Sequence, residues 1–125
     1  MRNNIALSLC IPTNGVVEWV LPVIHSIYAE KNPVGEFEVI VTDNGNNDKF
    51  VYLMAEYSKK YNNFYYTKTN RVQFLNQIEA FKLAKGELIK FINHRTMLMP
   101  GALNEFITYS VENRKERPVV YFLNG

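Results

Sequence analysis

A cluster of polar residues, Asp43 to Asp48, directly follows an apolar run in the segment FEVIVTDNGNND, residues 37–48. Such a run, bounded by turn-forming residues, is typical of a strand buried on both faces. The cluster then lies at the carboxyl end of that strand, where open α/β sheets bind ligands. Asp43 can accept hydrogen bonds from a bound group there, or it can simply close an Asx turn. Gly45 allows a tight turn, and Asn47-Asp48 can cap the following helix.

Several other chemistries have no matching motif in the sequence. There is no GxGxxG after the first apolar run and no GxxxxGK(S/T), which disfavours dinucleotide oxidoreductases and P-loop enzymes. No acidic pair follows that run, which argues against a phospho-receiver domain. His25 and His94 have no cysteine or carboxylate at zinc-ligand spacing. No serine lies in a nucleophile-elbow context, so a Ser/His/Asp triad is not predicted.

The composition is that of an ordinary globular domain, with 47% apolar and 21% charged residues in a chain of 125. A net charge of +2, from scattered Lys and Arg residues, argues against a nucleic-acid partner. The single cysteine, Cys10, excludes an internal disulfide and fits a reducing compartment. We expect it to be a buried thiol rather than a nucleophile. No signal-peptide pattern or run of ~20 apolar residues is present, so we expect a cytoplasmic protein.

Apolar periodicity divides the chain into alternating strands and helices. Strands are expected at Ile5–Ile11, Phe37–Thr42, Asn63–Lys68, Leu88–Ile92 and Val119–Leu123. The helices between them should bury these residues: Val20, Ile24, Ile27 and Tyr28; Phe50, Leu53, Met54, Tyr57 and Tyr61; Phe74, Ile78 and Phe81 of the helix Gln73–Lys85; and Leu103, Phe106, Ile107 and Val111. This alternation predicts a single domain over residues 1–125, with about five mostly parallel strands joined by right-handed crossovers.

A few residues set the bounds of these elements. Pro12 is expected to stop the first strand, and the next helix should begin near Pro22 or kink there. Gly86 is expected to cap the third helix, and Lys90 should reach out at the side of its buried strand. Pro100-Gly101 should open the last helix. Because the sequence stops directly after a predicted strand, we expect it to belong to a longer polypeptide.

Five segments, taken in order, resemble the amino-terminal half of family 2 glycosyltransferases of the GT-A fold: LSLCIPTN, Glu18, FEVIVTDNGNND, LAKGELIKFIN and MLMPGAL. The resemblance covers the chain from Leu7 to about Leu103, and several separate motifs agree. It implies a three-layer α/β/α, Rossmann-like sandwich. The strand order should be 3-2-1-4, with a crevice above the first two strands.

The resemblance also implies a set of nucleotide-sugar-binding residues. Pro12, Thr13 and Glu18 would line the nucleoside site, and Asp43 would read the edge of the base. Polar residues near the sugar diphosphate would be Asn70 and Asn76. Structural roles compete with these, because Thr13 can cap a helix and Glu18 can be a solvated first-turn acid.

Two segments depart from the family pattern. Asn14-Gly15 replaces an aromatic residue and Asn, so part of the pocket wall is expected to be lost. FINHRTML replaces the acidic DXD motif, typically Phe-Leu-Asp-x-Asp-Asp-x-Leu, which holds a divalent ion. Asn93, His94 and Arg95 supply no carboxylate, which argues against a Mg²⁺ or Mn²⁺ cofactor and predicts no metal site.

Three explanations of this replacement stay open. Arg95, with His94 and Asn93 beside it, could bind the diphosphate directly, since the planar fork of arginine pairs with phosphate oxygens. The site could instead have decayed to binding without chemistry. In the third explanation, both Arg95 and His94 simply face water.

The resemblance therefore implies the donor-binding half of a glycosyltransferase, with a UDP-sugar as donor and a saccharide or lipid-linked acceptor. Such enzymes commonly extend cell-surface or capsular polysaccharides, and a parent enzyme could associate peripherally with the inner membrane face. The general base for the acceptor hydroxyl is expected beyond residue 125, so this fragment alone should not turn over. The alternative is a non-catalytic nucleotide-binding or scaffold relative, which fold analogy cannot separate from an enzyme.

Overall fold

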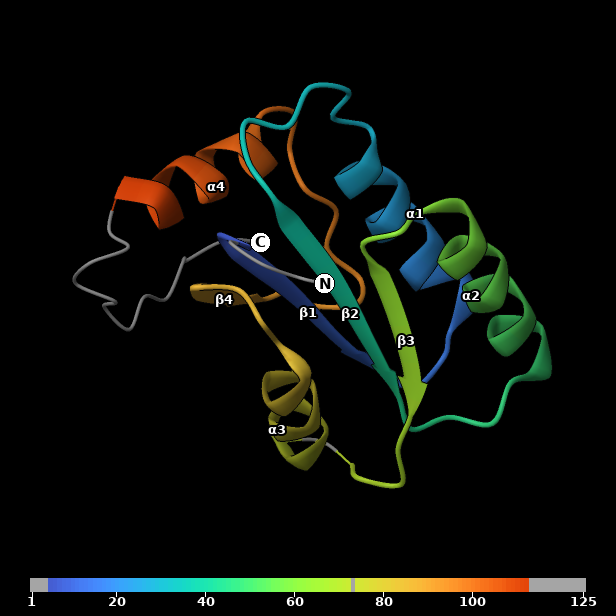
Figure 1. Cartoon of the computed structure of the whole chain (residues 1–125). Coiled ribbons are helices and arrows are strands. Elements are labelled where there is room, and N and C mark those ends of the chain that lie inside the picture. Colours follow the sequence, from blue (N-terminus) through green and yellow to red (C-terminus); the bar gives the residue numbers. More distant parts are fainter. Residues whose placement is uncertain (1–4, 73, 113–125) are drawn as a thin grey trace.

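Four parallel strands form a sheet in the computed structural model, which describes residues 5–72 and 74–112 (Figure 1). They are β1 (Leu7–Thr13), β2 (Phe37–Asp43), β3 (Phe64–Lys68) and β4 (Leu88–Phe91). Their order across the sheet is β3-β2-β1-β4, with parallel pairing throughout, as the sequence predicts. The expected fifth strand, Val119–Leu123, lies outside the described residues.

Helices cover both faces of this sheet: α1 (Val17–Tyr28), α2 (Asp48–Lys60), α3 (Phe74–Leu83) and α4 (Ala102–Glu112). Helices α1, α2 and α4 pack on one face, and α3 lies on the opposite face (Figure 1). Parallel strands need such long crossovers, because each strand must start again from the same edge of the sheet. The three-layer α/β/α, Rossmann-like architecture is therefore confirmed.

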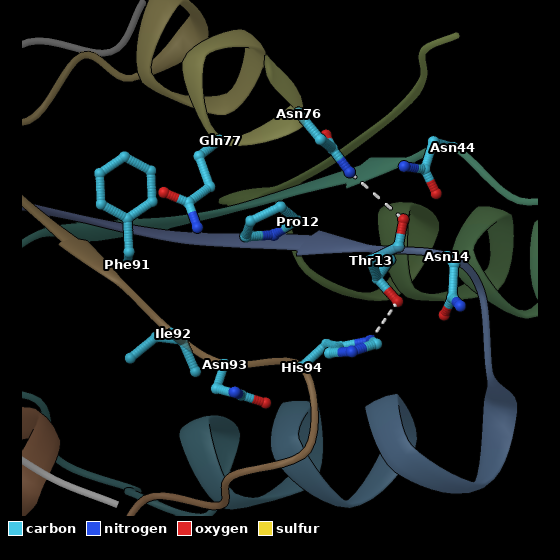
Figure 2. Close-up of a pocket in the computed structure, with 10 residues that line it drawn as sticks. All are labelled: Pro12, Thr13, Asn14, Asn44, Asn76, Gln77, Phe91, Ile92, Asn93 and His94. Atoms are coloured by element: carbon cyan, nitrogen blue, oxygen red, sulfur yellow. Dashed lines mark hydrogen bonds between the residues drawn. The ribbon is translucent and has the colours of Figure 1, made fainter. Parts of the chain in front are cut away.

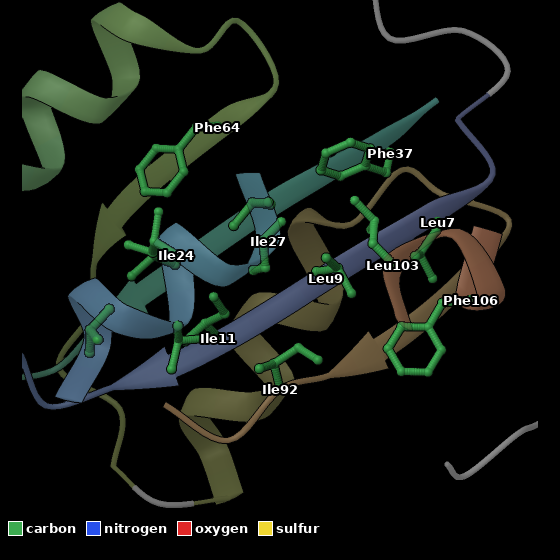
Figure 3. Packing of buried hydrophobic residues seen from close by; sticks show 14 of the residues in the cluster. Leu7, Leu9, Ile11, Ile24, Ile27, Phe37, Phe64, Ile92, Leu103 and Phe106 are labelled. Atoms are coloured by element: carbon green, nitrogen blue, oxygen red, sulfur yellow. The ribbon is translucent and has the colours of Figure 1, made fainter. Parts of the chain in front are cut away.

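Side chains of β1 alternate between two buried layers, as the pleat of a strand requires. Leu9 and Ile11 point into the larger core with α1, α2 and α4 (Figure 3), whereas Cys10 packs against Ala80 of α3. Burial raises the pKa of the Cys10 thiol to about 12, which fits the expected inert cysteine. All seven residues of β2 are buried, which confirms the prediction of a strand covered on both faces.

Pro12 does not stop the first strand, contrary to the prediction. Strand β1 continues to Thr13, and Pro12 pairs in register with Thr42 of β2. The amide of Ile92 donates to the carbonyl of Cys10 (2.8 Å). The backbone polar groups of Cys10, and of every second residue from it, therefore point toward β4, and Pro12 is one of these residues. Because β4 pairs with β1 only as far as Cys10, the missing N–H of Pro12 costs no ladder hydrogen bond.

Two helices also differ from expectation. Helix α1 begins at Val17, so the alternative in which it starts near Pro22 is wrong, and Pro22 lies inside the helix. In α3, Phe81 is predicted to point inward but is 56% exposed, and Ala80 takes the place against the sheet. Val111, at the end of α4, is also exposed. Periodicity alone places each residue on a helix face, but the angle at which a helix packs decides which part of that face is covered.

Lys90 and Gly86 have roles that the sequence did not predict. Lys90 does not reach out from its strand: its side chain is buried, with Nζ 5.6 Å from the centroid of the Phe106 ring. Gly86 lies beyond the end of α3 at Leu83 and does not cap it. A Cβ at Gly86 would lie 2.6 Å from Oγ of Ser8, so this glycine is needed where the chain passes close to β1.

Candidate functional site

The carboxyl ends of β1 and β2 lie side by side, as the sequence predicts. Thr13 and Asp43 are paired in register, and the amide of Asn44 donates to the carbonyl of Thr13 (3.0 Å). Next to this edge is a cavity of about 500 Å³ (Figure 2). Its walls come from the end of β1, the residue after β2, helix α3 and the end of β4, and they consist of Pro12, Thr13, Asn14, Asn44, Asn76, Gln77, Phe91, Ile92, Asn93 and His94.

Of the predicted site residues, Pro12, Thr13, Asn76 and Asn93 line this cavity. Thr13 does not cap the next helix, because its hydroxyl accepts from the amide of Gly15 (3.0 Å). The N-cap of α1 is Val16, whose side chain makes no capping hydrogen bond. The structure thus gathers four candidates from three separate elements around one cavity.

Glu18, Asn70 and Arg95 are exposed and are not part of the cavity wall. Glu18 lies in the first turn of α1, where a carboxylate interacts favourably with the helix dipole. In the next helix, the side chain of Asn47 caps α2 by accepting from the amides of Lys49 and Phe50, so Asp48 is the first helical residue and not the cap.

Asp43 is fully buried and shapes the loop beside the cavity. Its Oδ1 accepts from the amide of Gly45 (2.7 Å) and its Oδ2 from the hydroxyl of Tyr66. Burial and, secondly, this hydrogen bond raise the pKa of Tyr66. The Asx turn considered in the sequence is therefore present, and Asp43 is outside the cavity wall. Gly45 must be a glycine, since a Cβ there would lie 1.9 Å from the carbonyl oxygen of Asn14.

His94 closes one side of the cavity and is tied to β1. Its Nδ1 lies 2.8 Å from Oγ1 of Thr13 (Figure 2). Burial and, secondly, the charge of Arg95 lower the pKa of His94 below its ordinary value of 6.5. Oγ1 of Thr13 accepts from the amide of Gly15 and can donate its own proton to Nδ1 of a neutral imidazole. In that tautomer Nε2 of His94 carries the proton and acts as a donor.

Asn76 holds the ends of β1 and β2 together from helix α3. Its Nδ2 donates to the carbonyl oxygens of Thr13 (3.3 Å) and Thr42 (3.1 Å). Two carbonyl acceptors fix the orientation of the amide, because the flipped amide would turn its oxygen toward them. The side chain is 3% exposed and its Oδ1 has no hydrogen-bond partner.

Arg95 stacks on the side chain of Trp19, a residue that the sequence did not single out. The guanidinium carbon lies 4.6 Å from the centre of the indole ring, and the indole meets the His94 ring edge-on at 5.3 Å. The amide of Arg95 donates to Oδ1 of Asn93 (2.9 Å). The signal that the sequence offered for this contact was the single tryptophan of the chain, which lies in the first turn of a predicted helix.

The segment Asn93–Arg95 does not fit a divalent metal ion. Oδ1 of Asn93 is already used by the amide of Arg95, and a guanidinium stands where a carboxylate ligand would be needed. No three His, Cys, Asp or Glu side chains come together as a metal site within residues 5–72 and 74–112. Over the same residues, none of the helices has the length and apolar character to cross a bilayer.

The family model described as Glycosyl transferase family 2 matches residues 8–120, and the chain therefore belongs to this family. The poly(ribitol-phosphate) beta-glucosyltransferase of Bacillus spizizenii is 25% identical over 113 residues. That match covers 88% of this chain and 18% of the relative. The chain thus spans less than a fifth of that relative's length.

Two solved structures have the same fold over this region. Residues 1–349 of S. aureus TarS, in complex with UDP-GlcNAc, superpose with a TM-score of 0.73 at 21% identity, over 86% of this chain and 31% of that one. The mannosyltransferase PcManGT from Pyrobaculum calidifontis, in complex with GDP-Man and Mn²⁺, superposes with a TM-score of 0.67 at 15% identity, over 86% and 32%. The four-stranded sheet and its helices are therefore part of a GT-A fold.

Proposed function

We propose that this chain is the donor-binding part of a glycosyltransferase and that a UDP-sugar occupies the cavity beside Thr13, Asn76 and His94. The observation that carries the proposal is this cavity of about 500 Å³ at the carboxyl ends of the strands. Its size suits a small-molecule site, and its position is the one at which open α/β sheets bind nucleotides. Membership of the family and the UDP-GlcNAc complex of TarS support the same ligand class.

The diphosphate of the donor is bound without a metal ion in this proposal. The guanidinium of Arg95 supplies positive charge and a planar set of donors, and Nε2–H of the neutral His94 supplies a further donor at the cavity wall. Both groups stabilise the negative charge that develops on the leaving diphosphate. Asn93 orients the turn that presents them through its hydrogen bond to the Arg95 amide.

In the transfer reaction, the oxygen of an acceptor hydroxyl attacks the anomeric carbon as the bond to the diphosphate breaks. The diphosphate leaves with the bonding electron pair, and the configuration at the anomeric carbon inverts. The proton of the hydroxyl passes to a general base, which we place in the parent polypeptide beyond residue 125. The proposed acceptor is a saccharide or lipid-linked molecule at the cytoplasmic membrane face. The Bacillus relative is named for poly(ribitol-phosphate).

Calorimetric titration of the chain with UDP and UDP-GlcNAc, in EDTA and then in Mn²⁺, tests this proposal. We expect similar affinity under both conditions. Arg95→Ala should weaken UDP binding by about tenfold, as loss of a charge-assisted phosphate contact does. Arg95→Lys should keep part of the affinity, because it retains the charge but not the fork. Binding that appears only with Mn²⁺ would contradict the metal-free diphosphate site.

A second candidate function is nucleotide binding without transfer, and the absence of carboxylates at Asn93 and Arg95 favours it. The parent enzyme and the binding module differ in one measurable property. An enzyme releases UDP from UDP-GlcNAc when an acceptor is present, whereas a binding module leaves the donor intact. Assay of UDP release by the parent polypeptide separates the two.

A further inference from the structure

Trp19 is the aromatic residue that joins the start of α1 to the loop after β4. It lies in the first turn of the helix, where its amide donates to the carbonyl of Val16 (3.1 Å). Its side chain is 38% exposed, so it is not a core residue. One face of the indole carries the guanidinium of Arg95 at 4.6 Å, and the ring also meets that of His94 at 5.3 Å. Two neighbouring nitrogen-bearing side chains are thus held by one ring.

We propose that Trp19 is a positioning residue, which holds Arg95 beside the His94 wall of the cavity so that both donate to the diphosphate of a bound nucleotide. This inference rests on the proposed function. It adds a residue from a third segment, α1, to a site otherwise built from strand ends and α3.

The geometry of the stack explains how Trp19 can do this. A guanidinium that lies over an aromatic ring makes a cation–π contact with the ring face, and those of its N–H groups that do not point at the ring remain available to phosphate oxygens. An exposed arginine without such a support samples many rotamers and loses that freedom on binding. By stacking on Trp19, Arg95 loses part of this freedom before the ligand arrives, which favours binding.

The edge contact with His94 fixes the second donor. Nδ1 of the imidazole lies 2.8 Å from Oγ1 of Thr13, and the indole contacts the imidazole edge-on at 5.3 Å. The imidazole is therefore held by a hydrogen bond and a ring contact from two different elements. Arg95 and His94 are next to each other in sequence, so one aromatic support orients both.

The test compares UDP with uridine, which has the nucleoside but no phosphate. In EDTA, Trp19→Leu should weaken binding of UDP by about fivefold to tenfold, as expected for a cation–π contact and a charge-assisted hydrogen bond. Binding of uridine should stay as in the wild-type chain. Trp19→Phe, which keeps an aromatic face, should recover most of the UDP affinity. Tyr52→Leu is the matched control, since Tyr52 is 64% exposed on α2 and lies outside the cavity wall.

The chain has a single tryptophan, so its fluorescence reports on this position alone. UDP should change the emission of wild-type protein, whereas uridine should have little effect. If Trp19→Leu binds UDP as tightly as wild type, or loses UDP and uridine affinity equally, Trp19 has no positioning role while the proposed function stands. If the wild-type chain binds neither UDP nor UDP-GlcNAc, the proposed function itself fails, and this inference fails with it.

Discussion

Oγ1 of Thr13 lies 2.8 Å from Nδ1 of His94, although the two residues are 81 positions apart in the sequence. This contact joins the carboxyl end of the central strand β1 to the loop that follows β4. The same hydroxyl accepts from the amide of Gly15 (3.0 Å). One buried side chain therefore fixes two segments of the cavity wall.

Replacement of Thr13 by valine should affect both stability and binding. Thr13→Val keeps the shape of the side chain but leaves the buried Gly15 amide without its partner, which should lower the free energy of unfolding by about 1–3 kcal/mol. His94 loses its anchor, so UDP affinity should fall as well. Urea unfolding and calorimetry measure the two effects. Thr13→Ser keeps the hydroxyl and should lie close to wild type; equal values for the two variants would contradict this role.

His94 should make stability depend on pH. Burial and the nearby Arg95 lower its pKa below 6.5 in the folded chain, so the unfolded chain binds this proton more readily. Stability contributed by the neutral imidazole is complete above pH 6.5 and is lost as the pH falls toward the lowered pKa. The urea midpoint of unfolding should decrease as the pH is lowered from about 7.5 to about 5. This decrease should be smaller for His94→Gln than for wild type. His25→Gln is the control, and parallel curves for wild type and His94→Gln would rule out this assignment.

A carboxylate at position 76 should be poorly tolerated. Nδ2 of Asn76 donates to two carbonyl oxygens, those of Thr13 and Thr42. Asn76→Asp would place a buried negative charge against both, which should cost about 3 kcal/mol or more at neutral pH. Asn76→Ala removes the two hydrogen bonds without adding a charge and should cost less. The ranking of the two variants in urea unfolding is the test, and the opposite ranking would show that the amide is not oriented by these carbonyls.

Restoring two carboxylates should make nucleotide binding depend on metal. Asn93→Asp/Arg95→Asp removes the guanidinium and recreates an Asp-x-Asp motif, whose oxygens suit Mn²⁺. We expect the double variant to lose UDP affinity in EDTA and to regain it when Mn²⁺ is added. Asn93→Gln/Arg95→Gln is the control and should stay weak under both conditions. Unchanged UDP binding by the Asp variant in EDTA would show that Arg95 does not contact the diphosphate.

Gly45 and Gly101 should respond differently to alanine. A Cβ at Gly45 would lie 1.9 Å from the carbonyl oxygen of Asn14, so Gly45→Ala should force the loops apart and cost about 3 kcal/mol. Gly101 has a φ of +87° but nothing within 4 Å of a Cβ, and Gly101→Ala should cost only about 1–2 kcal/mol of backbone strain. Because Asn14 and Asn44 line the cavity, Gly45→Ala should also weaken UDP binding.

Much of the fold follows from local patterns in the sequence. The run around Ile40 predicts a strand covered on both faces, and β2 is buried throughout. Strand ends in a parallel sheet meet at one edge, so the ends of the first two strands could be expected to share a crevice. Periodicity and chain direction, which a sequence displays directly, are enough for these two predictions. The assignment of Pro12, Thr13 and Asn93 to one site came instead from the resemblance to family 2 glycosyltransferases.

Other parts of the site depend on contacts that no local pattern encodes. The burial of Asp43 is completed by the hydroxyl of Tyr66 from β3, and the position of Arg95 depends on the indole of Trp19 from α1. Phe81 has the spacing of a core residue, yet the packing of α3 leaves it exposed. Each outcome is set by how elements distant in sequence approach one another.

The central place of β1 has a consequence for synthesis of the protein. Its first residue, Leu7, pairs with Phe37 on one side and with Leu88 on the other, so the second neighbour is 88 − 7 = 81 residues later in the chain. At about 5–20 residues per second, a ribosome needs roughly 4–16 seconds to make that stretch. One edge of the strand stays unpaired during this time and is open to chaperones or to other nascent chains. His94 emerges later still, so the cavity can close only after all four described strands have been translated.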